Sequence, residues 1–122
     1  MIKLGVLMAL VLGLFAGAVS ATDLQPVGGR YIIDVRTEKE WNAGHIDGAV
    51  LIPHEQIGQR IGSVIADKSA PIALYCRTGR RSGIAMEALK KLGYTDVVNY
   101  GGLEQARQTV AAARECPAGA NC

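Results

Sequence analysis

Short apolar runs rich in β-branched residues alternate with helix-like segments along this chain, and this alternation constrains the fold more than any other feature. The predicted strands are residues 31–35, 49–52, 71–76 and 96–100. The predicted helices are residues 36–41, 55–66, 82–92 and 103–114. Strands that alternate with helices form right-handed βαβ units, whose parallel sheet is covered on both faces. The sequence therefore predicts one α/β domain with a mainly parallel sheet of about four or five strands, flanked by helices on both faces.

The third predicted helix has a marked apolar face. Its apolar residues recur at helical spacing, and Gly93 is a natural stop after them. We expect this face to pack against the sheet. Its members are Ile84, Ala85, Ala88, Leu89 and Leu92.

The first 21 residues resemble a leader for export. Lys3 precedes an uncharged run from Leu4 to Val19, and small residues continue to Ala21. A cation, an apolar stretch and small residues are typical of a secretory signal peptide. A membrane anchor is the alternative, but the run is shorter than the roughly 20 residues that span a bilayer. We therefore expect cleavage after about Ala21, a domain over residues 22–122 and a periplasmic protein that is free of the membrane after cleavage.

The charge balance excludes a broad nucleic-acid-binding surface. Lys and Arg total 13 against 11 Asp and Glu, a formal net charge of +2, whereas nucleic-acid-binding domains are strongly basic. His45 and His54 have no Cys or carboxylate at metal-ligand spacing. We expect no metal, no cofactor and no nucleic-acid partner, and a chain that acts as a monomer.

Two of the three cysteines lie in the C-terminal tail. Five residues, including Pro117 and Gly119, separate Cys116 from Cys122. Pro and Gly favour a turn, and disulfides persist in the periplasm. We expect a Cys116–Cys122 disulfide that leaves Cys76 as the free thiol. A frayed tail with free thiols is the alternative.

The segment from Cys76 to Ser82 carries the predicted chemistry. It reads Cys-Arg-Thr-Gly-Arg-Arg-Ser and joins a predicted strand to a predicted helix. Ligands of open parallel sheets bind beyond the carboxyl ends of the strands, and inward-facing N–H groups at a helix N-terminus attract an anion. Nearby cations also favour thiolate. We therefore expect the Cys76 sulfur to be exposed, anionic near neutral pH and ringed by amide hydrogens.

Each residue of this loop also has a purely structural interpretation. Cys76 is then a small buried side chain, Gly79 serves a turn, and Ser82 is a helix cap. The arginines are then a solvated rim. These interpretations are weak together, because the cysteine, the glycine, the arginines and the strand–loop–helix setting coincide.

The loop and several other segments resemble the rhodanese-like domain family of sulfurtransferases. Together with the leader, they are most similar to small periplasmic single-domain thiosulfate sulfurtransferases of the phage-shock type. The resemblance implies a single rhodanese-like domain with the sheet predicted above. The similar segments outside the loop are residues 33–36, 40–49, 52–53, 92–94 and 101–103.

The resemblance also implies a catalytic cycle. Cys76 would attack the outer sulfur of thiosulfate, release sulfite and become a persulfide, as in covalent catalysis. Cyanide or a thiol acceptor would then remove the sulfur. The partners would therefore be a small-molecule sulfur donor and a thiophilic acceptor.

The remaining roles follow from the same resemblance. Arg77 and Arg80 would steer the dianionic donor, and Arg81 would either bind substrate or pair with an acid and brace the loop. The implied substrate-binding residues are Arg77, Thr78, Gly79, Arg80 and Arg81. The implied structural supports are Asp34, Arg36, Glu40 and Ser82.

Three other functions stay open on the sequence alone. Cysteine phosphatases and arsenate reductases of related fold place five residues between cysteine and arginine, whereas four separate Cys76 from Arg81. A binding module without turnover does not need the cysteine that this chain keeps. A thiol–disulfide redox protein would usually carry C-x-x-C, which is absent from the sequence.

Overall fold

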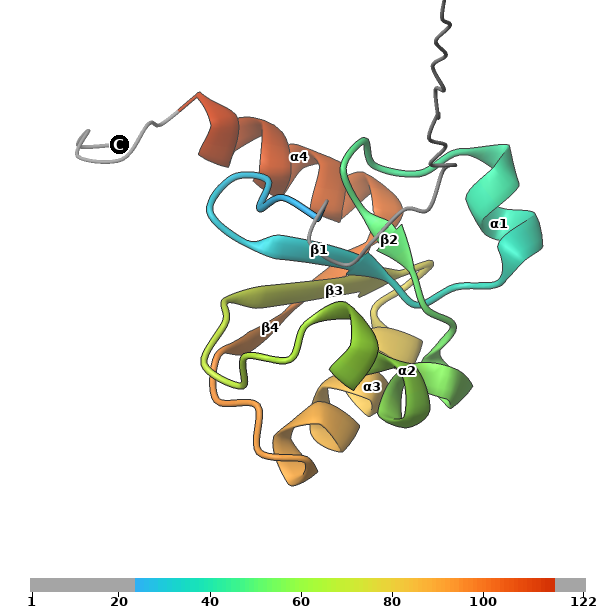
Figure 1. Cartoon of the computed structure of the whole chain (residues 1–122). Coiled ribbons are helices and arrows are strands. Elements are labelled where there is room, and N and C mark those ends of the chain that lie inside the picture. The colour runs from blue at the N-terminus through green and yellow to red at the C-terminus, as the bar shows by residue number, and fades with distance from the viewer. Residues whose placement is uncertain (1–23, 116–122) are drawn as a thin grey trace, which may run out of the picture.

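The computed structural model describes residues 24–115, which form a four-stranded sheet between two layers of helices (Figure 1). The strands are β1 (Tyr31–Asp34), β2 (Val50–Leu51), β3 (Ile72–Cys76) and β4 (Val97–Gly102). The helices are α1 (Glu38–Ala43), the 3-10 helix η2 (His54–Gln56), α2 (Ile57–Val64), α3 (Arg80–Lys91) and α4 (Leu103–Arg114). The predicted leader, its cleavage after Ala21 and the Cys116–Cys122 disulfide lie outside the described residues and stay predictions.

The sheet is parallel throughout, in the order β2-β1-β3-β4. Ile33 of β1 pairs with Leu74 of β3, which in turn pairs with Asn99 of β4. The carboxyl ends of these strands therefore meet at one edge of the sheet, which places the segments that follow them side by side. The predicted α/β fold class is confirmed.

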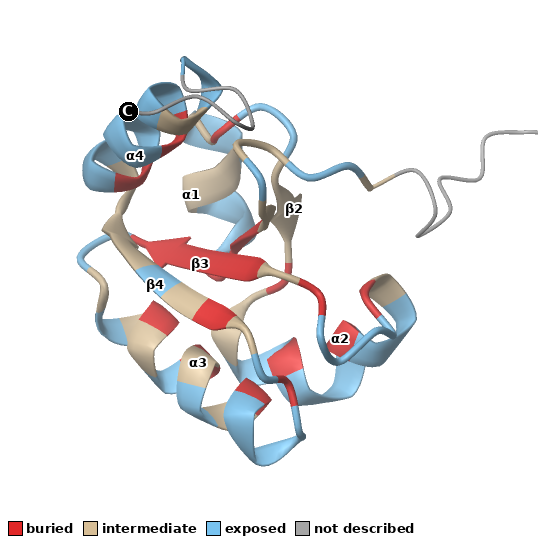
Figure 2. Cartoon of the chain, turned by 90° about the vertical axis from the view of Figure 1, so that its left-hand side faces the viewer, coloured by how far each residue is buried: buried red, intermediate tan, exposed pale blue. Residues whose placement is uncertain are grey.

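Side chains alternate between the two faces of β3, and both faces are buried (Figure 2). Leu74 and Cys76 belong to an apolar cluster with α2 and α3, whereas Ala73 and Tyr75 belong to a second cluster with α4. A strand covered on both faces reads as a continuous apolar run, which is why β3 is recognisable in the sequence. Among residues 24–115, no helix has the length and apolar character to cross a membrane.

The predicted apolar face of α3 is only partly correct. Ala85 and Leu89 are fully buried, but Ile84 is 49% exposed and Leu92 is 40% exposed. Ile84 precedes Ala85 by one residue, which is about 100° around a helix, so it turns away from the sheet. Leu92 is the C-cap residue of α3 and lies beyond its last turn. The buried stripe of α3 is therefore narrower than the sequence pattern predicts.

We expect Leu89→Ala and Leu92→Ala to differ in their effect on stability. Leu89→Ala empties a fully buried site and should lower the free energy of unfolding by about 2–5 kcal/mol. Leu92→Ala removes a partly exposed side chain and should cost about 1 kcal/mol or less. Urea unfolding of both variants and the parent measures the difference, and equal losses would contradict the observed packing of α3.

Candidate active site

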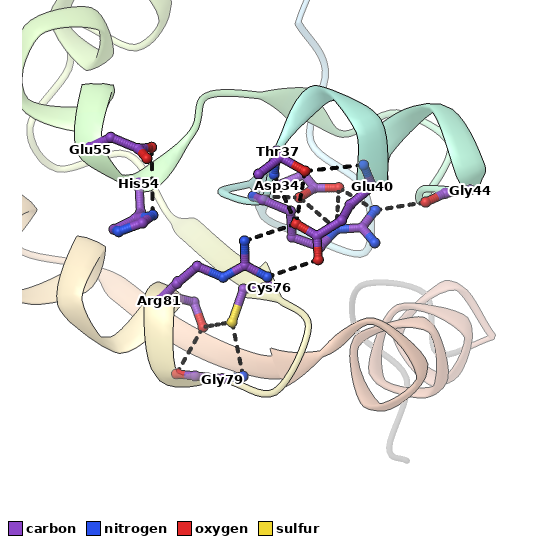
Figure 3. A network of polar contacts seen from close by, with 11 residues as sticks. Asp34, Thr37, Glu40, Gly44, His54, Glu55, Cys76, Gly79 and Arg81 are labelled. Atoms are coloured by element: carbon purple, nitrogen blue, oxygen red, sulfur yellow. Dashed lines mark hydrogen bonds and ion pairs between the residues drawn. The ribbon is translucent and has the colours of Figure 1, made fainter.

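Cys76 lies at the carboxyl end of β3, in the interior of the sheet (Figure 3). The chain turns from β3 into α3 over three residues, and Gly79 is the N-cap of α3 with φ of 98°. This left-handed conformation favours glycine and makes the turn sharp. Helix α3 therefore begins at Arg80, two residues earlier than predicted. The interpretation of Ser82 as a cap is wrong, because Ser82 lies inside the first turn of α3.

Two hydrogen-bond donors converge on the Cys76 sulfur. The Gly79 N–H donates to Sγ at 2.9 Å. The Ser82 hydroxyl oxygen lies 3.5 Å from Sγ. These donors come from one sharp turn and the start of one helix, as the sequence predicts for an anion site.

The expectation that the sulfur is exposed is wrong, because Cys76 is 0% exposed. The backbone of β4 closes over the loop: a Cβ at Gly102 would lie 2.5 Å from the Arg77 carbonyl oxygen, and one at Gly79 would lie 3.3 Å from the Gly101 Cα. Only glycines allow this close approach. Cys76 is therefore enclosed in this structure, and the Gly101–Gly102 backbone packs against the loop that follows it.

The pKa of Cys76 reflects two opposing effects. Burial raises the pKa of the thiol, whereas hydrogen bonds from the Ser82 hydroxyl and from the amides of Ser82, Thr78 and Gly79 lower it. The net result is a lowered pKa, because these donors stabilise the charged form. The predicted direction agrees with the structure, but hydrogen bonds rather than arginine charges are the leading cause.

Arg81 braces the loop against α1. Its guanidinium donates to both carboxylate oxygens of Glu40, at 2.8 and 2.9 Å, so the pairing alternative is the one the structure shows (Figure 3). The hydrogen bonds from Arg81 lower the pKa of Glu40 to about 2. Glu40 also accepts from the backbone N–H of Thr37, the N-cap of α1. The pair thus ties the loop after Cys76 to the start of α1.

The other two arginines of the loop are differently placed. Arg77 and Arg80 are exposed, and their side chains form no hydrogen bond or ion pair with another residue among those described. Their positive charges are therefore free to attract an anion toward the loop.

Asp34 and Arg36 form a buried ion pair that supports α1 rather than the loop. The Arg36 Nη2 lies 2.7 Å from Asp34 Oδ2 and also donates to the Gly44 carbonyl oxygen at 2.6 Å. Both side chains are almost fully buried. They join the end of β1 to the end of α1, the helix that carries Glu40. Their support of the site is therefore indirect.

Sequence reasoning missed Asn99 of β4. Its Nδ2 donates to the Gly79 carbonyl oxygen at 3.0 Å, and its Oδ1 accepts from the Gly101 N–H at 2.8 Å. The Ser82 hydroxyl lies 2.7 Å from the same Oδ1. A polar residue in a predicted strand, just before Gly101–Gly102, is the signal that identifies it. In the described part of the chain, no group of three or more His, Cys, Asp or Glu side chains is placed to hold a metal ion.

Comparisons with known proteins all point to one protein family. The family model described as "Rhodanese-like domain" matches residues 18–109. "Thiosulfate sulfurtransferase PspE" of Escherichia coli K12 is 42% identical over 72 residues, which cover 59% of this chain and 69% of that protein. "Probable adenylyltransferase/sulfurtransferase MoeZ" of Mycobacterium tuberculosis is 45% identical over 73 residues, but they cover only 18% of that protein and 58% of this chain.

A solved structure also resembles this one. The structure titled "rhodanese with anions from E. coli" superposes with a TM-score of 0.61 at 39% identity, over 62% of this chain and 89% of that chain. The similarity thus covers most of the solved chain, in sequence as well as in fold.

We expect Glu40→Gln to weaken the protein in a pH-dependent way. The change keeps an acceptor for Thr37 but removes the charge that pairs with Arg81, which should cost about 1–2 kcal/mol at pH 7. Because the pKa of Glu40 falls from 4.5 to about 2 on folding, the carboxylate stabilises the fold fully above pH 4.5, and this contribution is lost as the pH falls through about 2. Urea unfolding across this range measures the difference between the parent and the variant.

The matched control is Glu104→Gln. Glu104 pairs with Arg107 on the exposed surface of α4, so its loss should change stability by about 0.5 kcal/mol or less. A Glu40→Gln effect that stays constant from pH 7 to below pH 3 would contradict the assigned role of the Glu40 charge.

We also expect Cys76 to react as a thiolate at lower pH than a free cysteine. The rate of iodoacetamide alkylation at Cys76, followed by peptide mass spectrometry, should show an inflection below the value of about 8.5 for a free thiol. Removal of one donor by Ser82→Ala should move the inflection upward. An inflection at or above 8.5 in the parent protein would contradict the lowered pKa.

Proposed function

This chain belongs to the rhodanese-like domain family, and we propose that it is a sulfurtransferase that carries the sulfane sulfur of thiosulfate on Cys76. The observation that carries the proposal is the convergence of the Gly79 N–H and the Ser82 hydroxyl on the Cys76 sulfur. Such donors stabilise a singly charged sulfur atom, whether thiolate or persulfide. Relatives named as thiosulfate sulfurtransferases support the same assignment.

The first half-reaction loads the cysteine. The Cys76 thiolate attacks the outer sulfur of thiosulfate, a new S–S bond forms, and the S–S bond of thiosulfate breaks with its electron pair leaving on sulfite. The cysteine becomes a persulfide, whose negative charge lies on the outer sulfur. Arg77 and Arg80 are the exposed cations that attract the dianionic donor, and the loop amides hold the outer sulfur.

The second half-reaction returns the thiolate. Cyanide, or the thiolate of an acceptor, attacks the outer sulfur and takes it as thiocyanate or as a new persulfide. The electron pair of the broken S–S bond returns to the Cys76 sulfur. No proton is gained or lost overall when donor and acceptor are both anions, so the site needs hydrogen-bond donors for sulfur rather than a general base.

The position of Arg81 argues against phosphatase or arsenate reductase activity. Its guanidinium is paired with the Glu40 carboxylate, which offsets the positive charge that would attract a phosphate. The lowered pKa of Cys76 likewise argues against a binding module without turnover, since binding alone needs no thiolate.

Mass spectrometry of the protein after incubation with thiosulfate tests the proposal. We expect the parent to gain one sulfur atom on the Cys76 peptide and to lose it on addition of cyanide, with release of thiocyanate. Cys76→Ser should gain none at this position, because it lacks the nucleophilic sulfur. The double variant Cys116→Ser, Cys122→Ser should load as the parent does. A parent that takes up no sulfur but hydrolyses an aryl phosphate would overturn the proposal in favour of the phosphatase alternative.

A further inference from the structure

The Ser82 hydroxyl has one hydrogen and several acceptors within reach. Ser82 is fully buried, and its oxygen lies 2.7 Å from Asn99 Oδ1, 3.1 Å from the Gly79 carbonyl oxygen and 3.5 Å from Cys76 Sγ. A hydroxyl donates only one hydrogen bond at a time. The Gly79 carbonyl already accepts from the Gly83 N–H and from Asn99 Nδ2, which uses both of its lone pairs. The Ser82 hydroxyl hydrogen therefore has two main acceptors, the Asn99 amide oxygen and the Cys76 sulfur.

The orientation of the Asn99 amide is fixed by its backbone partners. The Gly101 N–H can only donate, so it requires Oδ1, and the Gly79 carbonyl can only accept, so it requires Nδ2. Asn99 Oδ1 is thus an acceptor that keeps the Gly101 donor even when the Ser82 hydroxyl turns away. Loss of the hydroxyl does not leave this oxygen unsatisfied, and its release carries little penalty.

We propose that Asn99 is a positioning residue, which holds the Ser82 hydroxyl while the cysteine is a neutral thiol and releases it to the sulfur when the sulfur is charged. In the neutral state the hydroxyl donates to Asn99 Oδ1 and its oxygen is free to accept from the S–H group. In the charged state the hydroxyl rotates and donates to the sulfur. Asn99 therefore acts on the thiol through Ser82.

The effect of Asn99 during turnover rests on the proposed function. In sulfur transfer the negative charge moves from Cys76 Sγ to the outer sulfur of the persulfide and back again. The Ser82 hydroxyl donates to Sγ when Sγ is charged and to Asn99 Oδ1 when it is not. This exchange leaves the backbone hydrogen bonds of the loop intact. The effect of Asn99 on the free thiol does not depend on any sulfur donor.

The charged groups around Cys76 come from several elements, and all of them influence a measurement of its titration. The Arg81 guanidinium interacts electrostatically with Cys76 and with Asp34, and it is paired with Glu40. Helix η2 packs against α3, and β4 contributes the neutral Asn99 amide. The ionisable groups to consider are Asp34 of β1, Glu40 of α1, His54 and Glu55 of η2, and Arg77, Arg80 and Arg81 of the loop and α3.

The pH dependence of Cys76 alkylation in the full chain tests the proposal. Asn99→Asp keeps the size of the side chain and accepts the Ser82 hydroxyl more strongly, because its acceptor is charged. It also loses the donor to the Gly79 carbonyl oxygen, and this loss is common to both backgrounds of the cycle below. We expect the inflection to rise by roughly one pH unit, which is about a tenfold slower alkylation below it. Gln108→Glu makes the same kind of chemical change, amide to carboxylate, at an exposed position of α4 and should leave the inflection unchanged.

A double-mutant cycle separates action through Ser82 from a direct effect of charge. If Asn99 acts through the hydroxyl, the shift caused by Asn99→Asp should fall to half or less in a Ser82→Ala background. Equal shifts in both backgrounds, or no shift in either, would overturn the proposal. A merely structural role changes stability without this coupling.

Asn99→Ala gives a second cycle if the Asp variant does not fold. We expect Asn99→Ala to shift the inflection by different amounts in the parent and in the Ser82→Ala background. Equal shifts in the two backgrounds would again overturn the proposal. Sulfur loading from thiosulfate is measured separately on the same proteins. If the shifts in the pH inflection are coupled but the protein takes up no sulfur, the proposed function is rejected and the role of Asn99 stands. If the shifts are additive and the protein loads sulfur, the role of Asn99 is rejected and the proposed function stands.

Discussion

The hydrogen bonds from the β3–α3 turn to the Cys76 sulfur are the interaction on which this site depends. Burial alone raises the pKa of a thiol and gives an inert apolar side chain. The Gly79 N–H at 2.9 Å and its neighbouring donors reverse that tendency. Because the shorter of the two printed contacts comes from the backbone N–H of Gly79, its direction is set by the turn itself. Stabilisation of the charged sulfur therefore depends on the geometry of the turn.

Contacts from separate parts of the chain hold this turn. Arg81 is tied to Glu40 of α1, and Asn99 of β4 fixes the Gly79 carbonyl. The Gly102 backbone packs directly against Arg77. The parallel sheet brings these residues together, because β3 pairs with β1 and with β4 and the carboxyl ends of parallel strands lie at the same edge. The buried Asp34–Arg36 pair adds a further layer, since it secures the helix from which Glu40 reaches the loop.

The sequence predicts this fold well and its site only in part. Helix α4 spans the predicted residues and β3 is evident, because local patterns specify them. Helix α3 begins early, since Gly79 and Ser82 are both acceptable N-caps and only the turn decides between them. Burial of Cys76 depends on the apolar cluster that it shares with α2 and α3, and no local pattern encodes this tertiary packing. The partner of Arg81 is likewise one of 11 acidic residues, and its choice rests on tertiary contact alone.

Enclosure of the thiol links its activation to its accessibility. In a buried site, each hydrogen bond to the sulfur is stronger than it would be at the surface, but the same burial limits the access of a reactant to Cys76. Asn99 joins three groups of the site, since it contacts the Gly101 N–H, the Gly79 carbonyl oxygen and the Ser82 hydroxyl. Its position therefore sets how strongly the amide oxygen competes with the sulfur for the Ser82 hydroxyl hydrogen.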